Sequence, residues 1–336
     1  MRDRPDDLRE PELRRALHAW LIDAVEVAHA PVGFGDHHWT ATGADGRRWF
    51  LTAADLTGKP RHGADADAAC QGLRGAMDTA AALRHGGLDF VIAPLTTPRG
   101  ETVRRVGARY ALSVFPFVDG APGEFGRKPS PGERGRMLDL LARLHRTAPP
   151  ESTPAHRPEL PTRPHLDHML TATGRPWEGG PYAEPARALV AEHAAALRLR
   201  LRRFDDHIRH LEAGGSRPVV THGEPHPGNV VRSAGRPLLV DWDTVALAPP
   251  ERDLWLVAED AADLARYADA TGHAPDPVVL ALYRLRWALD DVAAFVDYFR
   301  SPHAHTPDAE LSWESLAATL RWLAADHAGD ETAAPA

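Results

Sequence analysis

Apolar and polar residues alternate along much of the first third of the chain, whereas the rest carries apolar residues at helical spacing. A helix is predicted over residues 7–27 and strands over 31–56. A second helix is predicted over 64–86, and further strands over 89–118. We therefore expect a sheet accompanied by helices in this part of the chain.

The remaining two thirds predict a mainly helical region. Apolar residues at helical spacing predict a helix over 131–146, while recurring prolines between 149 and 185 leave room for only a turn or two around 165–173. Further helices are predicted over 184–211, 253–270, 276–300 and 311–327. The turn-rich sequence Asp-Gly-Ala-Pro-Gly at 119–123 separates the two regions. The pattern predicts an α+β fold divided into residues 1–118 and 119–336.

A short hairpin in the second region gathers polar side chains at one end. The apolar runs at 230–231 and 238–240 flank a Ser-Ala-Gly-Arg-Pro turn and should pair as antiparallel strands. That pairing returns Asp241 to the end where Asn229 lies, and amide and carboxylate oxygens suit Mg²⁺ with its phosphate ligands. Glu224, five residues before Asn229, is placed to orient or deprotonate an attacking hydroxyl. The hairpin therefore predicts a phosphoryl-transfer site.

These residues resemble the aminoglycoside phosphotransferases, which share their fold with protein kinases. The resemblance lies in His-Gly-Glu-Pro-His-Pro-Gly-Asn at 222–229 and Val-Asp-Trp-Asp at 240–243, and it covers the C-terminal half well. It implies a two-lobed protein-kinase-like fold, with a nucleotide-binding N-lobe of antiparallel sheet plus helix over 1–118. A larger, mainly helical C-lobe over 119–336 would carry catalysis and substrate binding.

The resemblance also implies roles for individual residues. Glu224 is the catalytic carboxylate, although the family normally has Asp there, and the longer side chain implies an altered reach. Asn229 and Asp241 hold Mg²⁺. His222 falls in the same catalytic loop, where the kinase fold has a structural His. Asp243 either assists the metal or caps the segment that follows.

A second group of positions corresponds to the nucleotide site of the family. The glycines lie in a turn between strands, and the segment 116–118 corresponds to the hinge that meets the base. The nucleotide-binding residues implied in this way are Gly33, Gly35, Arg48, Thr52, Pro116, Phe117 and Val118.

The chain departs from the family at the strand lysine that would contact the nucleotide phosphates. The matching position is Thr52, and lysine occurs only at Lys59 and Lys128. The helix predicted next contains no Glu to pair with such a lysine. Arg48, which shares a strand face with Thr52, or Lys59 or Arg61 just beyond, is a candidate for the missing positive charge.

These features predict an enzyme that transfers the γ-phosphoryl group of ATP or GTP, with Mg²⁺, to a hydroxyl of a small molecule. The predicted acceptor is an antibiotic of aminoglycoside, nucleoside or peptide type, which would give resistance or self-protection. Asp290, Asp291 and Asp297 on a late helix are candidates for binding a cationic group of the acceptor, or form a solvated helix face. The alternative is a catalytically impaired kinase-fold protein that binds a ligand or regulates a partner.

The composition indicates the compartment and the kinds of partner more clearly than it indicates the reaction. A formal net charge of −8 disfavours a general nucleic-acid binder, and Cys70 is the chain's one cysteine, which fits a reducing compartment. Apolar runs are too short to span a membrane, and the first 20 residues are charged rather than secretory. We therefore expect a cytoplasmic enzyme with no membrane partner. The 19 His residues show no clustered spacing typical of zinc sites.

Overall fold

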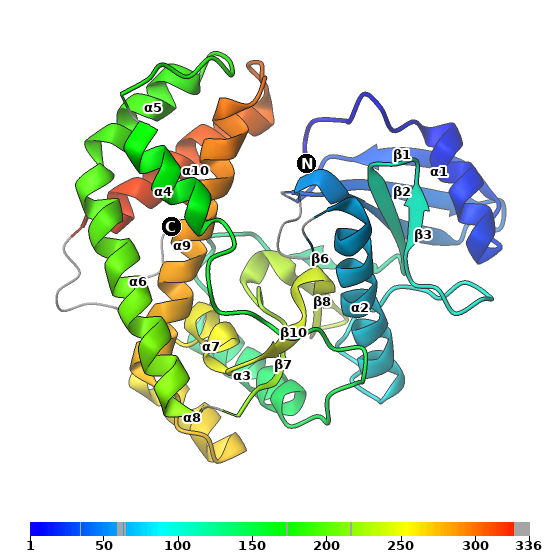
Figure 1. Cartoon of the computed structure of the whole chain (residues 1–336). Helices are drawn as coiled ribbons and strands as arrows, with labels where there is room; N and C mark the ends of the chain where they lie inside the picture. Colours follow the sequence, from blue (N-terminus) through cyan, green and yellow to red (C-terminus); the bar gives the residue numbers. More distant parts are fainter. Residues whose placement is uncertain (34, 59–62, 64, 173, 216, 326–336) are drawn as a thin grey trace. The chain divides into compact units, whose positions relative to one another are not determined.

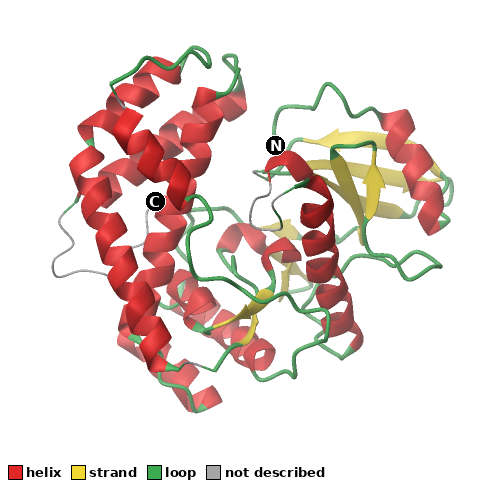
Figure 2. Cartoon of the chain, in the orientation of Figure 1, coloured by secondary structure: helices red, strands yellow, loops and turns green. Residues whose placement is uncertain are grey.

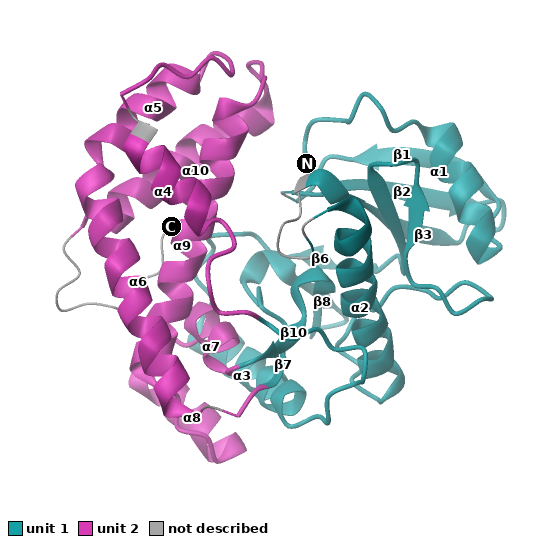
Figure 3. Cartoon of the chain, viewed as in Figure 1, with its two compact units in different colours: residues 1–156, 219–248 teal, residues 157–218, 249–336 magenta. Residues whose placement is uncertain are grey.

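The computed structural model describes residues 1–325 except 34, 59–62, 64, 173 and 216. The chain divides into two compact units, one of residues 1–156 with 219–248 and one of residues 157–218 with 249–336 (Figure 3). This division follows packing rather than chain order, because the segment 219–248 joins the N-terminal unit. The predicted lobe boundary at residue 118 stays a prediction.

The first unit contains an antiparallel sheet with the strand order β1-β2-β3-β5-β4 (Figure 1). Trp39 and Leu51 are fully buried on one face, in a core shared with Leu13 and Leu17 of the first helix. The period-two alternation of the strands produces this apolar face. The strands are β1 (Ala24–Ala30), β2 (His37–Gly43), β3 (Arg48–Asp55), β4 (Arg104–Val106) and β5 (Tyr110–Pro116).

Two longer helices of this unit begin with side-chain caps. The Asp65 side chain accepts from the backbone N–H groups of Asp67 and Ala68 at the start of α2 (Ala66–His85), and Ser130 and Glu133 form a capping box at the start of α3 (Pro131–His145). Helix α2 packs against the short helix η4 (Trp242–Thr244). The remaining elements of the unit are α1 (Glu10–Leu17), η1 (His18–Trp20), η2 (Leu56–Gly58), β6 (Ala121–Pro122), β7 (Val219–Thr221), η3 (Pro227–Asn229), β8 (Val230–Ser233), β9 (Arg236–Leu239) and β10 (Ala246–Ala248).

The helix predicted over residues 7–27 is wrong in its second half. Helix α1 ends at Leu17, the chain turns at Leu21 with a left-handed φ of 57°, and residues 24–30 form β1. The sequence Ala-Val-Glu-Val-Ala places β-branched residues at every second position, which favours a strand. Its antiparallel pairing with β2, the next strand along the chain, overrides the helical pattern.

The second unit is helical in its described residues (Figure 2). Its core includes Leu282, Val292 and Phe299 of the long helix α9, packed with residues of α6 and α10. The helices are α4 (Arg163–Ala172), α5 (Ala183–Glu192), α6 (Ala194–Gly214), α7 (Glu251–Val257), α8 (Ala261–Thr271), α9 (Pro277–Arg300) and α10 (Pro307–Ala324). No helix among these described residues is both long enough and apolar enough to cross a membrane.

Two predicted helices of this region are each divided in the structure. The prediction over 184–211 corresponds to α5 and α6, which meet at His193, and the prediction over 253–270 corresponds to α7 and α8. The second break occurs because Asp260 is extended and its side chain caps α8 by accepting from Asp263 N–H. The predicted helix over 311–327 begins earlier, at Pro307, and residues 326–327 lie outside the described part.

Candidate active site

The predicted hairpin is present and brings Asn229 and Asp241 to the same end. Val230 pairs with Leu239 in the antiparallel register of β8 and β9. One residue further, the Val240 N–H donates to the Asn229 carbonyl at 3.0 Å. Asp241 directly follows the residue that is bonded to Asn229. The two residues therefore lie at the same end of the hairpin, as predicted from the two apolar runs.

Hydrogen bonds hold this hairpin on both of its edges. On the β8 side, β6 pairs with β8, and the Gly123 N–H donates to the Val230 carbonyl at 2.7 Å. On the β9 side, the Leu239 N–H donates to the Phe90 carbonyl at 2.8 Å, and the Ile92 N–H donates to the Leu239 carbonyl at 2.9 Å. Both edges are therefore bonded at residues next to the end that carries Asn229 and Asp241, and these bonds fix that end.

Asp241 adopts a backbone conformation that is uncommon outside glycine. Its φ of 64° and ψ of 64° are left-handed, a region that Asp tolerates better than most residues. The next residue, Trp242, is fully buried, and its indole N–H donates to the Leu239 carbonyl at 2.9 Å. The buried ring therefore anchors the turn at Asp241. Asp243 follows in the first turn of η4, where an acidic side chain is favourable.

His222 connects the two halves of the site through its ring nitrogens. The Glu224 N–H donates to Nδ1 at 3.2 Å, so Nδ1 is the acceptor and Nε2 carries the proton that is donated to the Val240 carbonyl at 2.9 Å. The ring also packs edge-on against Trp242, with centroids 4.6 Å apart. Among the predicted catalytic residues, His222 is thus placed to position Glu224 and Val240 rather than to move a proton.

Asn229 is fixed by its amide nitrogen. Nδ2 donates to the Glu224 carbonyl at 3.0 Å and lies 3.4 Å from Nε2 of His226, and the residue is buried. With the nitrogen used for these contacts, the amide oxygen is the atom suited to a hard cation. The backbone of Glu224 is consequently held at both its N–H and its carbonyl, which sets the origin of its side chain.

A pH effect on stability is expected from His226. Burial lowers the pKa of His226 from 6.5 to about 4. Below pH 6.5 the unfolded chain therefore binds a proton that the folded chain does not, so stability falls as pH decreases from 6.5 to about 4 and flattens below that. The loss should be on the order of 2–3 kcal/mol. Urea unfolding of wild type and His226→Gln at pH 7 and pH 4.5 measures it; parallel pH dependences would contradict this assignment.

The contact between Gly123 and the segment 227–230 leaves no room for a side chain. A Cβ on Gly123 would lie 1.8 Å from the Pro227 carbonyl oxygen and 3.0 Å from that of Val230. Gly123→Ala should therefore push η3 and Asn229 aside and lower the free energy of unfolding by about 1–3 kcal/mol. Gly132→Ala is the matched control, since its Cβ meets nothing closer than Arg136 Nη1 at 3.7 Å. Equal melting temperatures for the two variants would refute this packing.

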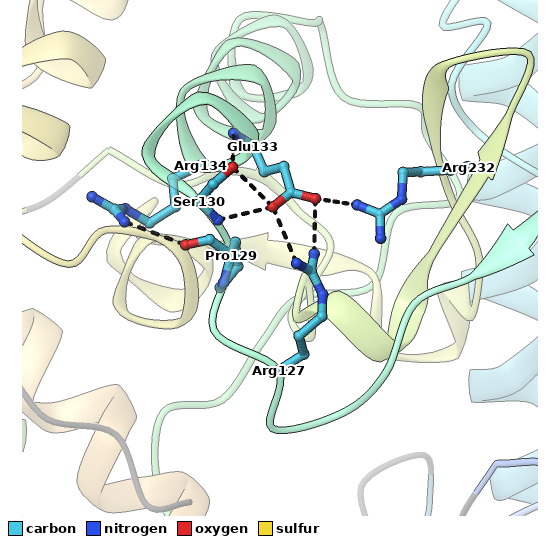
Figure 4. Close-up of polar contacts among 6 residues, drawn as sticks. All are labelled: Arg127, Pro129, Ser130, Glu133, Arg134 and Arg232. Carbon is cyan, nitrogen blue, oxygen red and sulfur yellow. Dashed lines mark hydrogen bonds and ion pairs between the residues drawn. The ribbon is translucent and has the colours of Figure 1, made fainter.

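A charged cluster that the sequence reasoning missed links the hairpin to α3. Figure 4 shows the Glu133 carboxylate between Arg127, Ser130 and Arg232. Arg127 donates to both carboxylate oxygens at 3.1 and 3.0 Å, the Ser130 N–H donates at 2.8 Å, and Arg232 of β8 forms an ion pair. The hydrogen bonds from Arg127, followed by those from Ser130, lower the pKa of Glu133 to about 2. The pattern Ser-x-x-Glu at 130–133 was the available signal, but it identifies a cap and not the partner on β8.

The predicted nucleotide residues lie on and around the sheet of the same unit. Gly33 and Gly35 have φ values of 75° and 96°, so a turn of glycines leads into β2, while Phe34 between them lies outside the described residues. Thr52 pairs with His38 across the β2–β3 ladder, and the His38 Nδ1 lies 3.2 Å from Thr52 Oγ1. Neighbouring strands therefore place an imidazole beside the position of the missing lysine.

Arg48 lies at the hinge end of β3 and not beside Thr52. Its guanidinium carbon is 3.9 Å from the centroid of the Phe117 ring, and it forms an ion pair with Asp119. Pro116 pairs with Trp49 at this end of the strand, just before Phe117 and Val118. Arg48 is thus placed near the hinge. The other candidates for the missing charge, Lys59 and Arg61, lie outside the described residues.

The acidic residues predicted to attract an acceptor have partners within the helical unit. Asp290 accepts from Thr162 Oγ1 at 3.1 Å and lies 3.6 Å from Arg286, and Asp297 lies 3.2 Å from His165 Nδ1. Asp291 is on the same helix, α9. The contact of Asp297 joins α9 to α4 and that of Asp290 joins α9 to the residue before α4, while the role of the three acids in acceptor binding stays a prediction.

An antiparallel sheet with its helices, a hairpin that carries Asn229 and Asp241, and a helical unit are the components of the α+β kinase-like fold. The chain belongs to the phosphotransferase enzyme family, whose model matches residues 30–288. The predicted family, the predicted kinase-like fold class and the prediction of a small-molecule phosphotransferase are thereby confirmed.

Individual proteins resemble the chain in sequence or in fold. The protein StrN of Streptomyces griseus is 32% identical over 259 residues, which cover 72% of this chain and 75% of StrN. A spectinomycin phosphotransferase, APH(9)-Ia, solved with ADP and spectinomycin, has a TM-score of 0.71 at 15% identity and covers 93% of this chain and 94% of its own. The amicoumacin kinase hAmiN, solved with AMP-PNP and Ca²⁺, has a TM-score of 0.57 at 13% identity, covering 95% and 94%.

Proposed function

We propose that the chain transfers the γ-phosphoryl group of ATP or GTP to a hydroxyl group of a small molecule. The observation that carries this proposal is the Val240 N–H bond to the Asn229 carbonyl, which brings Asn229 and Asp241 together on a hairpin held at both edges. An amide oxygen and a carboxylate on a fixed scaffold are the hard donors that a divalent cation on phosphates requires.

Mg²⁺ fits this donor set. No group of three His, Cys, Asp or Glu side chains gathers as a metal site in the described part of the chain, so protein residues alone do not form a cage. Mg²⁺ commonly takes one or two carboxylates and completes its shell with phosphates and water. Asp241 and Asn229 would hold it, with Asp243 as a further ligand, and the metal would neutralise charge on the phosphates.

We assign the remaining roles from the resemblance, supported by the backbone contacts of Glu224. Glu224 orients the acceptor hydroxyl and accepts its proton, and His222 fixes the backbone from which Glu224 extends. The transition state of phosphoryl transfer is loose, so orientation matters more than strong deprotonation, and the extra methylene of Glu relative to Asp is tolerable. The hinge at 116–118 and the glycine turn at 33–35 would meet the nucleotide.

The related proteins indicate the class of molecule that accepts the phosphoryl group. Solved structures with this fold include a spectinomycin phosphotransferase and an amicoumacin kinase, and the name of each enzyme gives an antibiotic as its substrate. We therefore assign a hydroxylated antibiotic of aminoglycoside, nucleoside or peptide type as the acceptor, with resistance or self-protection as the outcome. Such an enzyme would work in the cytoplasm, where the nucleotide is supplied.

The test is a screen for nucleotide consumption with Mg²⁺, run separately with ATP and GTP against a panel of these antibiotics. Mass spectrometry of each mixture should find one acceptor that gains a single phosphate. Consumption of nucleotide with no phosphorylated acceptor across a broad panel would contradict transfer to this acceptor class.

One observation favours a second candidate function. A neutral Thr52 occupies the position where the fold places a phosphate-binding lysine, as expected of a kinase-fold protein that binds a ligand or regulates a partner without efficient catalysis. Against it, Asn229 and Asp241 are both retained on a braced hairpin. Nucleotide binding with no transfer to any acceptor would favour this second function.

A further inference from the structure

The face of the sheet that carries Thr52 is less buried than the face packed on α1. Phe50 and Thr52 of β3 alternate with Trp49, Leu51 and Ala53, which are buried. Phe50 and Thr52 are only partly buried, so this face is not sealed by the hydrophobic core. It runs from the hinge, where Trp49 pairs with Pro116, toward Thr52.

His38 of the neighbouring strand β2 lies on the same face, opposite Thr52. Its Nδ1 lies 3.2 Å from Thr52 Oγ1, and its ring packs on Phe50 with centroids 5.1 Å apart. Its Nε2 lies 3.0 Å from the position that a Cβ on Gly33 would take. The imidazole is therefore placed between Gly33 and Thr52, the position that the resemblance assigns to the strand lysine.

The arginines of the described sheet strands are engaged elsewhere. Arg48 pairs with Asp119 at the hinge, Arg104 donates to Glu101 at 2.9 Å, and Arg105 donates to Asp67 at 2.6 Å. Arg48 is also four residues from Thr52 along an extended strand, a separation of about 13 Å. Among the described strand residues, the imidazole of His38 lies beside Thr52 and carries a nitrogen that can donate to a phosphate.

We propose that His38 contacts the nucleotide phosphates in place of the strand lysine, with Thr52 orienting its ring. This inference rests on the proposed function and deepens it. A nucleotide whose base meets the hinge extends its phosphates along the Phe50–Thr52 face toward the glycine turn, where the backbone of the glycines and the imidazole Nε2 meet them. An N–H donor from imidazole is a suitable partner for a phosphate oxygen.

The experiment compares ligands that differ only in their phosphates. Binding of adenosine, ADP and ATP with Mg²⁺ is measured by calorimetry for wild type and His38→Ala. The variant should bind ADP and ATP roughly 10- to 100-fold more weakly, the size expected for a lost hydrogen bond to a charged group, with adenosine affinity unchanged within about twofold. Thr52→Lys in the His38→Ala background should recover most of the ATP affinity.

His37→Ala is the matched control, because it removes an imidazole from the adjacent residue of the same strand. His37 pairs with Ala53, and its ring lies near Trp39 and Tyr110 on the opposite face, with centroids 6.3 Å from each. This variant should retain the wild-type ratio of ATP to adenosine affinity.

Three results would overturn the inference. These are an unchanged ATP affinity in His38→Ala, equal weakening of adenosine and ATP, and no recovery on introducing Lys at position 52. Each presupposes that wild type binds ATP. If wild type binds neither adenosine nor ATP nor GTP, the proposed function itself fails, and the two failures are thus distinguishable.

Discussion

Replacing Asp241 with Asn should lower the rate of phosphoryl transfer by about 10³-fold, since a metal that neutralises phosphoryl charge contributes several kcal/mol to the transition state. Asn keeps the shape of Asp and tolerates the left-handed backbone at this position, where φ is 64°. The fold should therefore survive, and the loss should be partly offset by raising the Mg²⁺ concentration. The rate is measured with the acceptor found in the screen, over a range of Mg²⁺.

The control for this variant is the same substitution on an exposed helix. Asp206→Asn removes a carboxylate from α6 that pairs with Arg209 at the surface. Such surface pairs contribute little to stability, so this variant should retain wild-type rates and melting temperature. Wild-type turnover in Asp241→Asn would remove Asp241 from the metal site.

Glu224→Gln should lower kcat by about 10²-fold, the lower end of the range for general acid–base catalysis, because Gln can still orient a hydroxyl but cannot accept its proton. The backbone of Glu224 donates to His222 and its carbonyl accepts from Asn229, so the substitution leaves the loop in place. Nucleotide affinity should change little. Steady-state kinetics that vary acceptor and nucleotide separately measure both quantities.

Two further variants sharpen this second prediction. Glu224→Asp restores the residue typical of the family and should retain far more activity than Glu224→Gln, since the carboxylate is kept. Glu192→Gln, at the exposed end of α5, is the matched control and should behave as wild type. A change confined to KM in Glu224→Gln would make Glu224 a binding residue.

Local sequence patterns predict the hairpin but do not predict the segments that bond to its edges. The apolar runs around the turn at 233–237 specify β8 and β9, because a tight turn and period-two alternation are local properties. The strand β6 and the segment 90–92, which bond to the two edges, lie more than 100 residues away in sequence. No local pattern indicates such partners.

The same distinction explains the remaining differences. The helix predicted over 7–27 extends into β1 because the pairing of residues 24–27 with β2 is not visible in the segment itself. His38 had no role in the sequence reasoning, since its significance arises from the register that places it opposite Thr52. Alternation along the strand places Arg48 on the same face as Thr52. Its contacts with Phe117 and Asp119 depend instead on the segment that follows β5, which the pattern of β3 does not indicate.

The central claim is that the hairpin end formed by Asn229 and Asp241 binds a nucleotide through Mg²⁺, and thermal unfolding with ATP or GTP tests it without knowledge of the acceptor. With Mg²⁺ present, millimolar nucleotide should raise the melting temperature of wild type, because a ligand that binds only the folded state stabilises it. Asp241→Asn should lose the part of this shift that requires Mg²⁺. No shift with either nucleotide, or a shift of equal size in Asp241→Asn, would contradict the claim.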